Sequence, residues 1–410
     1  MAIPFELKRS KIIGNIATLF SGSVVAQGMT AITLLLTARQ LQVDGYGQYA
    51  ACITLISMLS ILFSLGLDNW LLREGGRAPF KVGDIAGSVL AIKGIFGPIW
   101  IFILFLLSPI LNQQSFPSTL LRWSVILIWS DTLLATCLTV FKSMLHNKVP
   151  SIIEASADTI WLGCTLLLMW YGLSQPEAFM KIRVFVSLMA LSVSLLILVR
   201  RFNLHFHLNI AREALASSFP FASSDFLAMI TMRADVVIIS LTIGKTATGL
   251  YSPSVGLVNM AFLAPMAIYM VMLPVLSNLY KYHPQQAQIT ALRTILLSLM
   301  VGIGLTFVYF IGAPLITTLL GPTYQGSIDV LKILSWVLLF KCGSFAFATI
   351  MVATNQQAKR TLIQVIAAIT NIVLNLLVVF RYGINGVAFV YVLTEIIIFT
   401  GYAWFVWRNK

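Results

Sequence analysis

The sequence predicts an all-α integral membrane protein with about 12 transmembrane helices, in two six-helix halves around a central cavity. Composition gives the class: 59% of the 410 residues are hydrophobic and 10% are charged, whereas soluble domains carry about 25% charged residues. The length of the apolar runs gives the element type, because each is long enough to cross about 30 Å of hydrocarbon as a helix. They exceed the roughly ten-residue alternating strands of a membrane barrel.

Twelve apolar runs are expected to span the membrane. They fall at about 12–37, 47–69, 84–109, 118–141, 151–172, 182–199, 216–243, 250–280, 289–320, 327–354, 360–380 and 384–407. The first run has no small-residue cleavage site and is longer than a signal-peptide core, so we expect it to be a span rather than a leader. The connections are too short to form a folded domain outside the membrane.

Lysine and arginine residues predict the orientation. With a cytoplasmic N-terminus, 17 of the 27 cations fall in cytoplasmic stretches, 7 fall on the opposite side and 3 lie inside spans. Because cytoplasmic loops are enriched in Lys and Arg, this asymmetry predicts an even number of crossings and two cytoplasmic termini. We interpret the net charge of +13 as an orientation signal and an attraction to the phospholipid bilayer, and we expect no nucleic-acid partner.

A weak internal repeat suggests the two halves. Gly47-Gln48-Tyr49 opens the second span as Gly249-Leu250-Tyr251 opens the eighth, and Tyr171-Gly172 corresponds to Tyr382-Gly383. Six spans separate the members of each pair, which predicts halves at 1–201 and 202–410 repeated in parallel. Parallel repeats place a substrate site between the halves and favour transport by rocking of one half against the other.

Charged side chains inside apolar spans are energetically expensive and therefore mark candidate functional residues. The cations deep in spans are Lys93, Arg233 and Lys341. The acids there are Asp131, Asp158, Asp225, Asp235 and Glu395, and Arg39 and Asp68 lie near span ends.

The seventh span holds three of these charges. Arg233 and Asp235 are two residues apart, so on a helix they point about 200° away from each other and cannot pair. Asp225 lies roughly 12 Å away from Arg233 along the axis. Two interpretations stay open: Arg233 holds a substrate anion while Asp235 gates the path, or these charges form interhelical ion pairs that only fix packing.

No enzyme active site, cofactor or metal is expected. His205 and His207 supply only two potential metal ligands, which is too few for a metal site. Gly244-Lys245-Thr246 is similar to the end of a P-loop, but position 239 is Ile where that loop needs Gly.

Several short motifs resemble one family over nearly the whole chain. They are Ala38-Arg39-Gln40-Leu41 with Gly45-Tyr46-Gly47, Gly66-Leu67-Asp68 with Leu72-Arg73-Glu74, Arg233-Ala234-Asp235, Gly249-Leu250-Tyr251, Gly321-Pro322-Thr323-Tyr324, Asn375 and Gly383-Ile384-Asn385-Gly386. This pattern resembles the Wzx-type O-antigen and polysaccharide flippases of the multidrug/oligosaccharidyl-lipid/polysaccharide exporter superfamily. The glycine that ends the family's first-span pattern is replaced here by Gln42, and we expect this to alter only the loop.

The resemblance implies a flippase that moves an undecaprenyl-diphosphate-linked oligosaccharide, such as an O-antigen unit of lipopolysaccharide, across the bacterial inner membrane. A polysaccharide polymerase and a chain-length regulator would be its partners. Cationic side chains suit a diphosphate, so we expect Arg233 and Lys341 to bind it, with Arg39 and Lys93 assisting. Asp225, Asp235 and Asp68 are expected to act in gating or ion coupling.

A cation-coupled multidrug or metabolite antiporter of the same superfamily stays open as the alternative, because five intramembrane acids would suit cationic substrates. A polymerase or ligase of the pathway is disfavoured, because such proteins need large extracytoplasmic loops.

Overall fold

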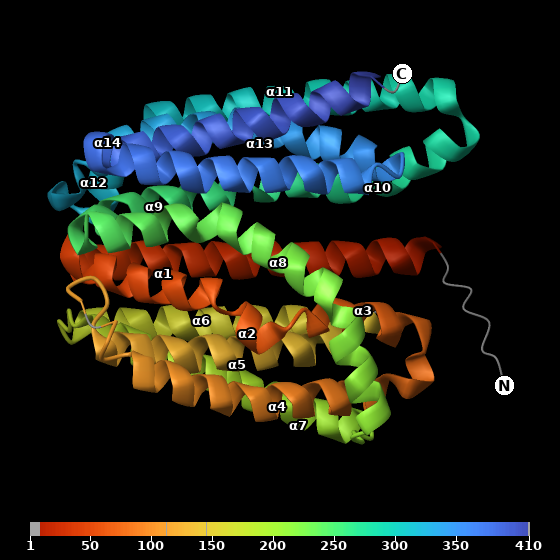
Figure 1. The fold of residues 1–410 in the computed structure, drawn as a ribbon, viewed down its shortest axis with the longest axis horizontal. Coiled ribbons are helices and arrows are strands. Elements are labelled where there is room, and N and C mark those ends of the chain that lie inside the picture. The colour runs from red at the N-terminus through yellow and green to blue at the C-terminus, as the bar shows by residue number, and fades with distance from the viewer. Residues whose placement is uncertain (1–8, 112, 145, 409–410) are drawn as a thin grey trace. The chain divides into compact units, whose positions relative to one another are not determined.

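The computed structural model of the chain consists of helices and short connections, and the residues that it describes contain no β-strand (Figure 1). It describes the backbone of residues 9–111, 113–144 and 146–408, and their side chains except those of 9–21, 23, 220, 223–225, 227, 228 and 231. The elements are α1 (Arg9–Met58), α2 (Ile61–Ser64), α3 (Leu67–Arg77), η1 (Pro79–Lys81), α4 (Val82–Leu107), α5 (Ser118–Ser143), α6 (Lys148–Trp170), α7 (Pro176–Arg201), α8 (Leu208–Thr242), α9 (Lys245–Ala261), α10 (Leu263–Tyr282), α11 (Pro284–Gly312), α12 (Leu315–Leu320), η2 (Pro322–Tyr324), α13 (Ser327–Ala353) and α14 (Gln357–Arg408).

The helices account for about twelve membrane crossings, which confirms the predicted fold class. Within the described residues, eight helices are long and apolar enough to cross, or nine with the bent pair 24–58 and 61–77. The 52 residues of α14 would extend about 78 Å as one helix, so α14 forms two crossings that meet at Gly383. The first part of α1 and the 35-residue α8 complete the set.

Two breaks divide the longest helices. Gly383 has φ 58° and ψ −147° in α14, and Gln42 has φ 57° and ψ 179° in α1. Glycine reaches such angles without a Cβ clash, but for other residues this region is strained by about 1–3 kcal/mol. The missing family glycine therefore coincides with a strained break between the first and second spans, which is a larger effect than the loop change expected from the sequence.

The second span is broken again after α2. Leu65 (φ 50°) and Gly66 (φ 68°) turn the chain into α3. A Cβ added at Gly66 would lie 2.4 Å from the backbone nitrogen of Ala222 in α8. Only glycine therefore fits where this break meets α8.

The chain divides into two compact units. Unit 1 contains Met1–Thr37 and Cys52–Phe226, and unit 2 contains Ala38–Ala51 and Leu227–Lys410. Residues 38–51 thus pack with unit 2 although the chain on both sides of them belongs to unit 1. The halves 1–201 and 202–410 stay a prediction about the sequence repeat.

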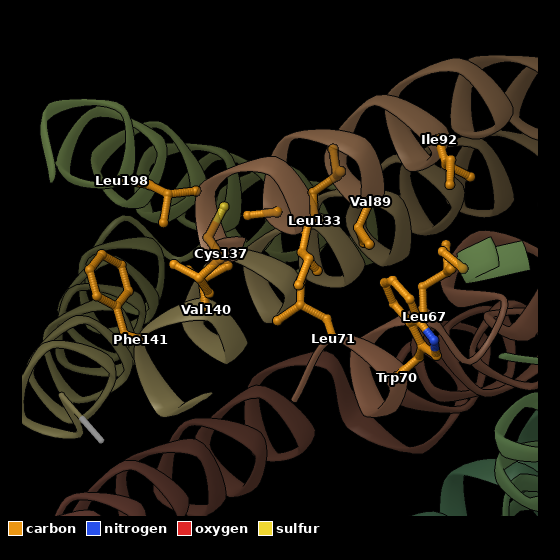
Figure 2. Packing of buried hydrophobic residues seen from close by; sticks show 14 of the residues in the cluster. Leu67, Trp70, Leu71, Val89, Ile92, Leu133, Cys137, Val140, Phe141 and Leu198 are labelled. Carbon is orange, nitrogen blue, oxygen red and sulfur yellow. The ribbon is translucent and has the colours of Figure 1, made fainter. Parts of the chain in front are cut away.

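Unit 1 is built around α5. Leu133, Cys137 and Val140 of α5 are buried against Leu71 of α3 and Val89 of α4, as Figure 2 shows. Burying such apolar side chains is the main source of close helix contact in this unit, and it holds the broken second span against the bundle.

Unit 2 is built around α13, which packs against α9, α10, α11 and α14. Its buried Phe347 contacts the rings of Phe399 and Trp407 in α14 edge-on, with centroids 5.5 and 5.9 Å apart. α5 is the fourth span of the first half and α13 is the fourth span of the second half. Each is the central helix of its own unit.

Backbone conformation also follows the repeat. Gly172 and Gly383, which the sequence aligns through their Tyr-Gly pairs, both have positive φ angles, of 68° and 58°. Gly172 follows the end of α6, whereas Gly383 lies between the two crossings of α14. The aligned Tyr-Gly pairs thus share a positive-φ glycine.

Candidate substrate site

Lys93 in α4 forms an enclosed ion pair within unit 1. Its Nζ lies 2.8 Å from both carboxylate oxygens of Asp68 in α3. It also donates to the hydroxyl of Thr136 (2.7 Å) and to the carbonyl of Thr132 (3.3 Å), both in α5. The Lys93 side chain is fully buried, whereas that of Asp68 is 25% exposed.

This arrangement leaves the Lys93 ammonium no donor for another ligand in this state. Thr136 also donates to Asp68 at 2.7 Å, so lysine, carboxylate and hydroxyl form a closed network. The structure therefore joins two residues for which the sequence predicted separate roles, Lys93 in substrate binding and Asp68 in gating. Here the pair ties α3 to α4 and α5.

A second charged cluster in unit 1 surrounds Arg183 of α7. Its guanidinium stacks on the ring of Trp161 at 4.2 Å from the centroid and attracts the carboxylates of Asp131 and Asp158. Asp131 also accepts a 2.5 Å hydrogen bond from Ser187. Arg183 lies at the start of the predicted run 182–199, and α7 begins earlier, at Pro176.

Asp235 in α8 is held within unit 2 by neutral donors. It accepts a hydrogen bond from the hydroxyl of Tyr251 in α9 (2.7 Å) and from the backbone N–H of Val236 (2.8 Å). As the helical spacing predicts, the described side chains show no ion pair between Asp235 and Arg233, although the two charges attract each other.

Arg233 differs from Lys93 and Lys341. It is half-buried, and among the side chains that the structure describes none makes a hydrogen bond or ion pair with its guanidinium. Tyr391 of α14 interacts electrostatically with Glu395, Asp235 and Arg233, so these groups share one polar region of unit 2.

Lys341 of α13 belongs to the same region but has a partner. Its Nζ donates to Glu395 of α14 at 2.6 Å and lies 5.2 Å from the centroid of the Phe262 ring. Glu395 is fully buried, whereas 19% of the Lys341 side chain is exposed. The lysine charge is therefore partly neutralised by Glu395.

The remaining predicted site residues lie elsewhere. Arg39 is exposed in the segment 38–51, and the side chain of Asp225 lies outside the described residues. The sequence singled out no neutral polar cluster, but Asn371 and Asn375 of α14 form one in unit 2. Asn375 donates to Asn371 (3.0 Å), and Asn371 donates to Thr394 (3.2 Å). The four-residue spacing of the asparagines was the one signal for it.

Comparisons with solved structures define the class of fold. A structure titled "Lipid II flippase MurJ, inward closed conformation" matches with a TM-score of 0.74 at 15% identity, covering 95% of this chain and 87% of that one. An inward-facing multidrug resistance MATE family transporter of the MOP superfamily matches with a TM-score of 0.73 at 12% identity, covering 92% and 94%. The eukaryotic MATE transporter AtDTX14 gives 0.67 at 14% identity, covering 97% and 96%. The chain thus has the fold of these transporters.

Sequence comparison places the chain within a family. The profile of the family described as "Polysaccharide biosynthesis protein" matches residues 12–280, more than half of the chain. The chain belongs to this family, as the motifs predicted. No curated protein matches it in sequence.

Proposed function

We propose that the chain is a flippase for a lipid-linked oligosaccharide. It would move an undecaprenyl-diphosphate-linked repeat unit, of the O-antigen type, from the cytoplasmic to the outer leaflet of the bacterial inner membrane by alternating access. Both termini would lie in the cytoplasm, and a polysaccharide polymerase and a chain-length regulator would use the product. Family membership supports the pathway, and the fold supports transport without an enzymatic step.

The observation that carries the proposal is the state of the intramembrane cations. Lys93 is fully occupied by Asp68, and Lys341 is paired with Glu395. Arg233 has no such partner among the described side chains. A charge inside a bundle is tolerated where it meets a polar partner or water, and a planar guanidinium binds diphosphate oxygens in a bidentate manner.

We therefore assign the leading role in diphosphate binding to Arg233. Lys341 follows, because it would have to share its charge between Glu395 and the substrate. Arg39 would assist near the membrane surface. Asp235, held by Tyr251, would act as a gating or ion-coupling group, and the same role is proposed for Asp225.

Cells that depend on this chain for surface polysaccharide test the proposal. Arg233→Ala is expected to cause accumulation of lipid-linked repeat units and loss of surface polysaccharide while the protein is still inserted. Arg233→Lys should retain part of the activity, because it keeps the charge without the bidentate geometry. Arg381→Ala is the matched control, because Arg381 is exposed and lies 5.5 Å from the Tyr382 ring centroid.

The same cells separate the proposal from the antiporter alternative. If overproduction of the chain protected cells against cationic drugs while Arg233→Ala left surface polysaccharide normal, the antiporter would replace the flippase. Two fold neighbours bear multidrug transporter titles, which makes this arm of the experiment necessary.

A further inference from the structure

Residues 38–51, here called the strap, are an unusual part of unit 2. Thr37 before the strap and Cys52 after it belong to unit 1, yet the strap packs within unit 2. The strap joins the first span to the second. It therefore lies on the membrane side opposite the start of the first span.

The strap crosses the start of α9 at two glycines, Gly47 and Gly249, whose backbones lie too close to the opposite segment for any side chain to fit. A Cβ on Gly47 would lie 1.9 Å from the carbonyl oxygen of Lys245, and a Cβ on Gly249 would lie 1.9 Å from that of Val43. Real Cβ atoms do not approach other atoms this closely. Each glycine thus packs on the carbonyl four residues before the other glycine.

This reciprocity has a symmetric origin. Gly47 and Gly249 are the residues that the sequence repeat aligns, and the same offset relates Val43 to Lys245. Gly47 contacts Lys245, and the equivalent residues Gly249 and Val43 make the same contact in the opposite direction. Such a reciprocal pair of contacts defines a local two-fold axis. The crossing therefore has a local two-fold symmetry that follows the sequence repeat.

Polar contacts surround the crossing. Asp44 accepts a hydrogen bond from Thr246 (2.6 Å) and pairs with Lys245 (3.1 Å). The η2 turn adds two contacts, from the hydroxyl of Tyr324 to the carbonyl of Ala38 (2.7 Å) and from Thr323 to Gln42 (3.0 Å). Asp44 is 54% exposed, so its ion pair is screened by solvent and contributes little to holding the contact.

The chain has two backbone breaks near this contact, one inside the strap and one after it. The strained Gln42 lies inside the strap, and Leu65 and Gly66 break the second span beyond it. After that break, α3 is fixed to unit 1 by the pair Asp68–Lys93. The second span is therefore held at one end by the strap and at the other end by the Asp68–Lys93 pair, with the break at Leu65 and Gly66 between them. Such a break allows the part next to the strap to move while α3 stays in place.

We propose that the strap, residues 245–249 of α9 and η2 together form an outer clasp, which is the closing contact on the outer side of the transport path. The contacts of the clasp are formed within unit 2 in this structure, and in the proposal they release once per cycle, when the substrate leaves toward the outer leaflet. Its role rests on the proposed function, whereas its existence rests on the geometry of unit 2. Reciprocal glycine packing suits such a contact, because it depends on shape and not on strong bonds that would resist release.

A reversible cross-link tests the clasp. The pair Asp44→Cys and Thr246→Cys is introduced with the four native cysteines replaced by alanine, and the protein is reconstituted into vesicles with a fluorescent undecaprenyl-diphosphate oligosaccharide. Oxidation is expected to form the disulfide and to lower flipping at least about tenfold, corresponding to about 1.4 kcal/mol, and reduction should restore it. The matched control is Thr119→Cys with Glu177→Cys, a similar 2.5 Å pair within unit 1, which should cross-link without affecting flipping.

A glycine replacement gives an independent measurement. Gly47→Leu should reduce the yield of the clasp disulfide, because leucine cannot occupy the crossing, whereas Gly256→Leu in α9 should not, because its Cβ meets open space. Absence of the disulfide in the otherwise native clasp, or full flipping while it is formed, would overturn the clasp and leave the flippase intact. Absence of flipping in the reduced protein and in the wild type would overturn the proposed function, and the clasp's role with it.

Discussion

Removal of either partner of the Lys93–Asp68 pair should destabilise the protein, and by unequal amounts. Breaking a buried ion pair by removing one partner costs about 3–5 kcal/mol, because an uncompensated charge stays buried. Asp68→Asn leaves the fully buried Lys93 ammonium without its carboxylate, so we expect the full penalty. Lys93→Met leaves Asp68, whose side chain is 25% exposed, so solvent screening reduces the expected cost to about 2 kcal/mol.

The double variant Lys93→Met/Asp68→Asn carries no charge at this place and should recover most of the stability. The free energy of unfolding in detergent micelles, measured for all four proteins, gives the coupling between the two positions. Additive losses in the double variant, or wild-type stability in both single variants, would refute the ion-pair account. A double variant that is stable but unable to flip would instead assign the pair to transport.

Three further changes follow from the geometry. Lys341→Gln should weaken substrate binding less than Arg233→Ala does, because Glu395 already neutralises part of the lysine charge; half-saturation concentrations in vesicles measure this, and an equal or larger loss would contradict it. Gln42→Gly should stabilise the protein by about 1 kcal/mol or more by relieving a positive-φ strain, although it removes the contact with Thr323; a lower unfolding free energy would show that the side-chain contact outweighs the strain. Hydrogen bonds from Thr246 and Lys245 lower the pKa of Asp44 below its usual 3.8, so its contribution is present above that pH and is lost as the pH falls below it. The difference in unfolding free energy between wild type and Asp44→Asn should therefore be constant from about pH 8 to 5 and vanish only below about pH 4. If this difference were instead lost around neutral pH, the lowered pKa of Asp44 would be refuted.

The sequence predicted the class of the fold because composition and the length of apolar runs depend on the bilayer alone. It also identified which charges lie inside the spans. It could not pair them, because Lys93 and Asp68 come from helices whose contact is decided by tertiary packing. The start of the sixth helix was also missed, since α7 begins at Pro176, before the apolar run at 182–199.

Backbone breaks were the least predictable feature. Gly383 has a residue type that permits positive φ, so its break could be inferred from the Tyr-Gly repeat. Gln42 gives no such signal, and its role became visible only as the residue in place of the family's glycine. The close crossing of Gly47 and Gly249 needed the structure, although the repeat had already aligned the two residues.

The transfer of an undecaprenyl-diphosphate oligosaccharide across vesicle membranes by wild type, Arg233→Ala and Arg381→Ala tests the central claim most directly. A charge-assisted hydrogen bond contributes about 1.5–3 kcal/mol, so loss of the Arg233 guanidinium should slow transfer by about 10- to 150-fold. The Arg381 variant should match the wild type. Transfer by Arg233→Ala at the wild-type rate, with equal amounts of folded protein in the vesicles, would contradict the claim that this arginine holds the diphosphate.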